Sequence, residues 1–274
     1  PAEKLWTRAI MPPILVCWNQ HSAWMFQAGY GAGFWALAVR EDRRMDGMGE
    51  RDALSRAVAA ERTVVVFDFD GTLADTMGGI VEVASGVLRD FGLDEECLAD
   101  CPKLVGPPFP EAFSEVFGLS LADAQLVTDR FRERYNGRGL VNWPNFPGIP
   151  ELVRELSRAG RTVAVASSKR EETLRVALRQ EGIHDLFDRV RGKRRELGHD
   201  KADTLRELIG ELDVAPDDVV MVGDRFYDVD AALACGLPCV GVTYGRTAPA
   251  GELERAGACS VAESVEELGR VLLG

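Results

Sequence analysis

The chain has 274 residues, of which 46% are hydrophobic and 28% charged, an ordinary composition for a globular protein of one large domain or two. Aspartate and glutamate number 44 against 32 lysines and arginines, so the formal net charge is −12. Such an acidic surface repels the nucleic-acid backbone, and we expect no nucleic-acid partner. A small phosphorylated substrate is still compatible, because a local cationic pocket and a metal ion can outweigh the global field.

Six cysteines are spread along the chain without a C-x-x-C pair. Cys235 and Cys239 flank a Gly-Leu-Pro turn inside an apolar pattern, as small core residues do. This usage favours reduced thiols over a disulfide framework or a zinc site. It predicts a cytoplasmic protein.

Residues 1–61 are an unusual N-terminal extension. Between Ala9 and Val39 there is no Lys, Arg, Asp or Glu, and the segment is rich in tryptophan. Ser22–Val39 is long enough to suggest a membrane span, but its glycines and aromatic residues lack the sustained Leu/Ile/Val character of one. We expect a poorly ordered or non-native extension, with an accessory helix or membrane contact as the alternatives.

A short apolar run, Val64–Phe67, leads into the acidic stretch Asp68–Thr76. Apolar, β-branched residues followed by a glycine predict a buried strand that opens into a loop. Side chains alternate along a strand, so Asp68 and Asp70 would share one face, but a turn at Gly71 would orient them separately. Paired carboxylates at a strand end suit a hard cation together with a nucleophile or an acid–base group. A surface turn rich in Asp and Gly is the alternative.

The hydrophobic pattern changes twice after this loop. Residues 77–147 show helical spacing and no convincing strand, with helices predicted at Ile80–Phe91, Glu111–Phe117 and Leu121–Tyr135. From residue 148 onward, apolar strands alternate with helices. The predicted strands are Thr162–Ala166, Phe187–Val190, Asp218–Val222 and Pro238–Val242, and the predicted helices are Glu151–Arg158, Glu171–Gln180, Lys201–Leu212, Val229–Ala234 and Val265–Leu273.

This alternation predicts an α/β fold with a Rossmann-like parallel sheet that is covered by helices on both faces. Right-handed crossovers would place the carboxyl ends of all strands along one edge, where open α/β sheets bind ligands. We therefore predict three parts: the extension 1–61, a core domain of residues 62–76 and 148–274, and an inserted all-helical domain of residues 77–147.

Polar residues follow several of the predicted strands. They are Asp68, Asp70, Ser167, Ser168, Lys169, Asp224 and Asp228, with Lys201 at the start of the helix before the fourth strand. Four ordered motifs, Asp-Phe-Asp-Gly-Thr, Ser-Ser-Lys, a lysine and Gly-Asp-Arg-Phe-Tyr-Asp, resemble the haloacid dehalogenase superfamily over about residues 62–274. Within it, the chain is most similar to the phosphoglycolate-phosphatase-like branch. The resemblance implies that residues 77–147 form a helical cap.

The resemblance also implies a Mg²⁺-dependent phosphatase that acts through an aspartyl-phosphate. Asp68 would be the nucleophile, Asp70 the general acid and base, and Lys201 the cation that neutralises the nucleophile and the phosphate. Phosphate oxygens would be bound by Gly71, Thr72, Ser167 and Ser168, and Mg²⁺ by Asp68, the Asp70 carbonyl, Asp224 and Asp228. Lys169 and Lys193 are alternatives to Lys201, and many relatives have asparagine in place of Ser168.

Other roles remain open at this point. Asp224 and Asp228 could instead cap a helix after a strand. The same site would also serve a phosphotransferase or mutase, including one directed at protein tyrosine. A non-enzymatic regulatory protein on this fold is a further alternative, against which the intact acidic residues count. The sequence identifies neither the substrate nor the oligomeric state.

Overall fold

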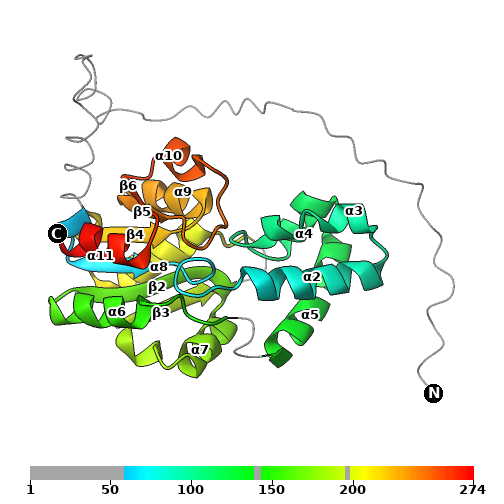
Figure 1. The fold of residues 1–274 in the computed structure, drawn as a ribbon, viewed down its shortest axis with the longest axis horizontal. Helices are drawn as coiled ribbons and strands as arrows, with labels where there is room; N and C mark the ends of the chain where they lie inside the picture. The colour runs from blue at the N-terminus through cyan, green and yellow to red at the C-terminus, as the bar shows by residue number, and fades with distance from the viewer. Residues whose placement is uncertain (1–58, 139–142, 195–197) are drawn as a thin grey trace, which may run out of the picture. The chain divides into compact units, whose positions relative to one another are not determined.

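The computed structural model describes residues 59–138, 143–194 and 198–274 (Figure 1). The described residues all belong to one unit of the chain, Met45–Gly274. The predictions for the N-terminal extension therefore lie outside the described residues, apart from its end at residues 59–61. Within the described ranges, no helix is long and apolar enough to cross a membrane.

A six-stranded parallel sheet with the order β3-β2-β1-β4-β5-β6 forms the core. Its strands are β1 (Val64–Phe67), β2 (Thr162–Arg170), β3 (Arg189–Lys193), β4 (Val219–Gly223), β5 (Cys239–Val242) and β6 (Ser260–Ala262). β1 lies between β2 and β4, with Phe67 paired to Val165 and Val222. All carboxyl ends lie along one edge, and the predicted parallel α/β fold is confirmed.

Helices cover both faces of the sheet, because the strand side chains alternate between two hydrophobic clusters. Val65 and Phe67 belong to one cluster, and Val64 and Val66 to the other. The first cluster is covered by α6 (Ile149–Arg158), α7 (Glu171–Gln180) and α11 (Val265–Leu273), and the second by α8 (Lys201–Leu212), α9 (Phe226–Ala234) and α10 (Glu252–Ala256). Burial on both faces explains why β1 is continuously apolar rather than alternating.

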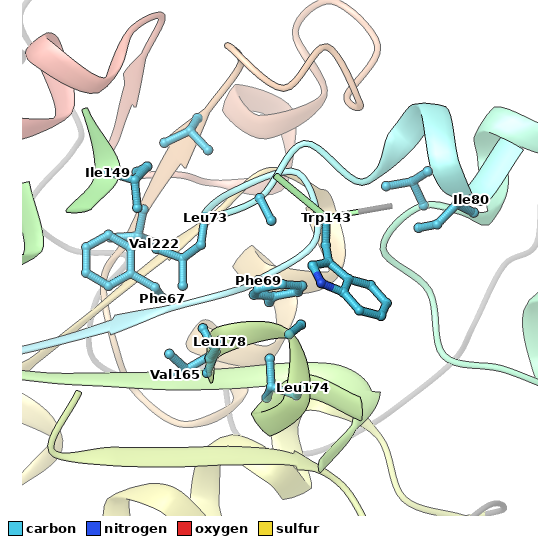
Figure 2. Close-up of a cluster of buried hydrophobic side chains, with 14 of the residues drawn as sticks. Phe67, Phe69, Leu73, Ile80, Trp143, Ile149, Val165, Leu174, Leu178 and Val222 are labelled. Carbon is cyan, nitrogen blue, oxygen red and sulfur yellow. The ribbon is translucent and has the colours of Figure 1, made fainter. Parts of the chain in front are cut away.

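Figure 2 shows part of the first cluster, in which Phe69 and Leu73 join the side chains of the sheet. These two residues come from the loop after β1, and they lie among Val165 of β2 and Leu174 of α7. Both loop side chains are fully buried. Burial of each such side chain stabilises the fold by about 1.5–3 kcal/mol, and it anchors the loop that carries Asp70.

A helical insertion separates β1 from β2, as predicted. It consists of α2 (Met77–Phe91), α3 (Glu95–Leu98), the 3₁₀ helix η1 (Cys101–Leu104), α4 (Glu111–Phe117) and α5 (Leu121–Arg138). α5 buries one stripe at helical spacing, including Val127, Phe131 and Tyr135. The insertion corresponds to the expected cap, while its boundaries at residues 77 and 147 stay a prediction.

The two chain segments that join the cap to the core are hydrogen-bonded to each other. The Asp75 N–H donates to the Pro144 carbonyl (2.8 Å), and the Phe146 N–H donates to the Leu73 carbonyl (3.0 Å). Ala74 also forms an antiparallel bridge with the intervening residue, Asn145. The base of the cap is therefore a short two-stranded connection.

Some element boundaries differ from the predicted ones. β2 continues past Ala166 to Arg170, with a shift of register against β3 on the way. β6, α3 and α10 were absent from the sequence prediction because elements this short show no hydrophobic period. The remaining short elements are the 3₁₀ helices η3 (His184–Leu186) and η4 (Pro216–Asp218). The extension of β2 carries Ser167, Ser168 and Lys169 to the site edge.

Candidate active site

Asp68 follows β1 directly, and only 2% of its surface is exposed. Lys201, the first residue of α8, places its Nζ 2.9 Å from Asp68 Oδ1 and also in contact with Asp228 Oδ1. All three side chains are buried. A buried ammonium between two carboxylates offsets part of the cost of removing those charges from water.

The surroundings shift the pKa of these groups. Burial raises the pKa of Asp68 from its ordinary 3.8 to about 6, although Lys201 opposes the shift. Burial alone would lower the pKa of Lys201, but Asp228 and Asp68 raise it above its usual 10.5. Burial, with Asp228 and Asp68 nearby, also raises the pKa of Asp224. Additional positive charge next to Asp68 and Asp224 would therefore favour their ionised forms.

Three carboxylates form what we call the acidic cluster: Asp68, Asp224 and Asp228 each present an oxygen, and these oxygens lie within 4.8 Å of one another. Asp224 accepts hydrogen bonds from the hydroxyls of Thr72 (3.1 Å) and Thr247. A buried set of oxygen donors with excess negative charge fits a divalent cation.

Asp228 combines two roles that the sequence presented as alternatives. Its Oδ2 accepts a hydrogen bond from the backbone N–H of Arg225 (3.0 Å), at the start of α9. Its Oδ1 contacts Lys201. One oxygen therefore caps the helix, while the other belongs to the acidic cluster.

The loop after β1 packs directly against the acidic cluster. Gly71 has a φ of +80°, and a Cβ added there would lie 2.2 Å from Asp224 Oδ2. A Cβ added to Gly245 would in turn lie 2.4 Å from the Gly71 carbonyl oxygen. Only glycine satisfies both the left-handed backbone and this close approach at position 71.

Asp70 has different partners from Asp68. The Lys169 ammonium donates to both of its carboxylate oxygens, at 2.9 and 3.2 Å. Asp70, Ser168 and Lys169 line one side of a cavity of about 60 Å³, and Leu104, Phe109, Phe131, Arg132 and Tyr135 of the cap line the other. We call this cavity the cap pocket. The two aspartates thus face different surroundings, as a turn at Gly71 implies.

The three candidate lysines have three separate environments. Lys201 contacts Asp68, and Lys169 contacts Asp70. Lys193 instead donates to the carbonyl of Phe109 (2.9 Å) and to Glu111 Oε2 (3.0 Å), both in the cap. The structure therefore brings Lys201, rather than Lys193 or Lys169, beside the predicted nucleophile.

The predicted phosphate-binding residues occupy varied positions. Ser167 is buried, and its hydroxyl oxygen accepts from the Lys169 N–H (3.3 Å). The Ser168 hydroxyl is buried with no hydrogen-bond partner among the described residues, next to the cap pocket. The Thr72 hydroxyl is bound to Asp224. Phosphate binding by Gly71, Thr72, Ser167 and Ser168 stays a prediction.

Residues beyond the predicted set also shape the site. Thr247 binds Asp224, and the Tyr244 hydroxyl donates to the Thr72 carbonyl (2.7 Å). Both follow β5, whose carboxyl end lies on the same edge as those of β1 and β4. That position is the signal that could have identified them.

Comparison with known proteins agrees with this geometry. The model of the haloacid dehalogenase-like hydrolases matches residues 65–242. The chain belongs to this family. A crystal structure of a predicted phosphatase from Clostridium acetobutylicum has a TM-score of 0.73 and 33% identity, covering 77% of this chain and 98% of that one.

Curated relatives of this family member carry several names. A 5′-nucleotidase of Pseudomonas aeruginosa is 33% identical over 182 residues, which cover 66% of this chain and 82% of that protein. A phosphoglycolate phosphatase of Agrobacterium fabrum is 31% identical, with 70% and 85% covered. The tyrosine-protein kinase PtkA of Mycobacterium tuberculosis is 37% identical over 66% of this chain, but the match spans only 62% of that protein. The chain is an enzyme of the phosphatase class within the family, and the phosphoglycolate-phosphatase-like resemblance is confirmed.

Proposed function

We propose that this enzyme is a Mg²⁺-dependent phosphatase that hydrolyses a small phosphorylated metabolite through an aspartyl-phosphate. The observation that carries the proposal is the separation of the two aspartates. Asp68 lies beside Lys201 in the buried acidic cluster, whereas Asp70 lies beside the cap pocket. A nucleophile and an acid–base group need different surroundings, and these two carboxylates have them.

In the proposed reaction, an Asp68 oxygen attacks phosphorus while the bond from phosphorus to the leaving oxygen breaks. Asp70 gives its proton to that oxygen, and the dephosphorylated product leaves. A water molecule then attacks the phosphorus of the aspartyl-phosphate, and Asp70 takes up the proton that the water loses. This step releases inorganic phosphate and restores Asp68. Lys201 offsets the charge on Asp68 throughout.

Asp68, Asp224, Asp228 and the Asp70 carbonyl would hold Mg²⁺ in this proposal. A bound Mg²⁺ would neutralise charge shared by the nucleophile and the phosphate. The fit rests on the excess negative charge of the acidic cluster over Lys201. Thr72 and Thr247 orient Asp224, which prepares one ligand before the metal binds.

The size of the cap pocket supports a small substrate. A cavity of about 60 Å³ beside Asp70 is small compared with the ~300–1,000 Å³ typical of ligand pockets, so it suits a compact leaving group with the cap in this position. The names of the 5′-nucleotidase and phosphoglycolate phosphatase relatives also describe small phosphomonoesters.

The five cysteines in the described part of the chain are free thiols, which supports a cytoplasmic location.

A second candidate is phosphoryl transfer to another acceptor, including a protein tyrosine. The similarity to PtkA favours it. A tyrosine on a protein surface would need the cap to move away from Asp70, so the small volume of the cap pocket supports the hydrolase instead.

Turnover of a panel of phosphorylated metabolites, with Mg²⁺ or with EDTA, tests the proposal. We expect release of inorganic phosphate only with the metal present, and a loss of at least about a thousandfold in Asp68→Asn. Accumulation of a phosphorylated acceptor instead of inorganic phosphate would support the transferase. Turnover retained by folded Asp68→Asn would show that Asp68 is not the nucleophile.

A further inference from the structure

We propose that Lys169 is a positioning residue that orients Asp70, and that the cap holds Lys169 through the ring of Tyr135. This inference rests on the proposed function, in which Asp70 is the acid and base. It adds a series of contacts that runs from Tyr135 of α5 in the cap, through Lys169, to the carboxyl group of Asp70.

Lys169 fixes Asp70 from a rigid support. Its ammonium donates to both carboxylate oxygens, at 2.9 and 3.2 Å, which restricts rotation of the carboxylate. Only 11% of the Lys169 side chain and 14% of the Asp70 side chain are exposed, so water competes weakly for this pair. Lys169 itself belongs to the extended end of β2, and its N–H donates to Ser167.

Two aromatic rings confine the Lys169 ammonium. Its Nζ lies 4.9 Å from the centroid of the Tyr135 ring and 5.5 Å from that of Phe69. Both distances are within the range of about 6 Å for cation–π attraction. Phe69 belongs to the core, whereas Tyr135 belongs to α5 of the cap. The position of Lys169 therefore depends on both parts of the enzyme.

The Tyr135 ring is itself held in place by other aromatic side chains of the described chain. It stacks on Phe131 with centroids 5.0 Å apart and contacts Trp143 at 5.4 Å. Only 2% of Tyr135 is exposed. Because this packing restrains the ring, the cap presents it to Lys169 as a fixed surface, and cap closure would complete the orientation of Asp70.

A misplaced acid has a characteristic kinetic effect. An alkyl leaving oxygen is strongly basic and needs a proton as it departs, whereas p-nitrophenolate leaves without one. Loss of acid catalysis typically costs 10²–10⁴-fold. In the first half-reaction this loss applies mainly to the alkyl substrate, whereas the role of Asp70 as a base in the second half-reaction is common to both substrates. Loss of fold or of the acidic cluster would instead lower the turnover of both substrates alike.

The test compares kcat/KM, which reports the first half-reaction, for p-nitrophenyl phosphate and for the best alkyl phosphomonoester of the metabolite panel. For Lys169→Met we expect a loss of about a hundredfold on the alkyl substrate and of a few-fold on the aryl one. Lys169→Arg should restore part of the difference. Tyr135→Leu should lower the alkyl-to-aryl ratio about three- to tenfold, and Tyr135→Phe, which keeps the ring, should lower it less than Tyr135→Leu does.

Lys193→Met is the matched control, because Lys193 is also a buried lysine that contacts the cap but not Asp70. It should change both rates by the same factor. Equal losses on both substrates in folded Lys169→Met, or a raised KM with unchanged kcat, would overturn the proposal. The KM result would identify Lys169 as a substrate-binding group. Asp68→Asn distinguishes failure of this inference from failure of the proposed function, since retained turnover in that variant would overturn the proposed aspartyl-phosphate mechanism itself.

Discussion

The acidic cluster and the cap pocket are neighbouring regions built in different ways. The cluster consists of side chains that follow β1 and β4 or begin α9, all within the core and all buried. The cap pocket takes Asp70 and Lys169 from the core and its other wall from η1, α5 and the loop between η1 and α4. One region is complete without the cap, and the other exists only with it.

This difference assigns the two regions different parts of the reaction. The core can hold the proposed nucleophile and the proposed metal ligands whatever the cap does, because Lys201 and the acidic cluster belong to the sheet and its helices. Orientation of the acid and the space for the leaving group depend on the cap. Changes in the cluster should therefore affect every substrate, and changes at the cap should affect substrates selectively.

Among the changes that distinguish the two regions, the largest effect is expected for Gly71→Ala, which places a methyl group 2.2 Å from Asp224 Oδ2. Displacement of a metal ligand by about 1 Å should lower kcat/KM about a hundredfold for all substrates and weaken Mg²⁺ binding. Gly236→Ala is the control, since Gly236 has a similar φ of +76° but no heavy atom within 4 Å of an added Cβ. It should cost stability, about 1–2 kcal/mol, and leave kcat/KM unchanged. Steady-state kinetics and thermal melts measure both, and near-normal activity in Gly71→Ala would contradict the assigned geometry.

A smaller effect is expected in the pH dependence of stabilisation by Mg²⁺. The pKa of Asp68 is raised from 3.8 to about 6, so its contribution to the stability of the metal-free fold is full below about pH 4 and is lost as pH rises through 6. Above pH 6 the ionised carboxylate would be available to the proposed Mg²⁺. At a hundred times its Kd, Mg²⁺ would add about 2.7 kcal/mol.

Thermal melts with and without Mg²⁺ between pH 5 and 8 measure this dependence. We expect a rise in Tm of roughly 5–10 °C at pH 7.5 that shrinks below about pH 6. Asp224→Asn should remove most of the shift. A Mg²⁺ effect of equal size at pH 5 and pH 8 would contradict competition between protons and metal at the acidic cluster.

The smallest effect is expected for Lys193→Met. Lys193 links β3 to the cap through Phe109 and Glu111, outside the contacts of Asp70. Its loss should disturb the end of β3 and Glu111 without moving Tyr135 or Lys169, and should lower kcat/KM about two- to fivefold, to a similar extent for small alkyl and aryl phosphates. Kinetics on both substrates measure it. A strongly substrate-selective effect would place Lys193 in substrate recognition and weaken the contrast between the two regions.

Most of the core fold could be predicted from the sequence, because long periodic elements carry their own signal. The helices at Glu111–Phe117, Glu171–Gln180, Lys201–Leu212 and Val265–Leu273 have the predicted boundaries. The three-residue strand β6 shows no period, and the continuation of β2 passes through polar residues that resemble a loop. These two elements depend on pairing with neighbouring strands, which a single segment does not reveal.

The acidic cluster could be predicted from the topology of the sheet, because parallel strands bring their carboxyl ends together. The structure places Asp68, Asp224 and Asp228 side by side on this basis. The contact of Lys169 with Asp70 could not be predicted, since it depends on where β2 ends and on a ring from the cap. Thr247 was missed for a similar reason, because the direction of a loop side chain has no periodic signal.

The two-stranded connection at Ala74 and Asn145 limits how the cap can move. A domain tied at one flexible point can tumble in any direction. The cap is tied at two adjacent points that are hydrogen-bonded to each other, so its easiest motion is rotation about the single axis through them. Rotation about that axis would separate Tyr135 from Lys169 and leave the sheet edge intact. Because the two segments that join the cap to the core lie side by side, a different cap could be inserted between them without altering the strands of the sheet.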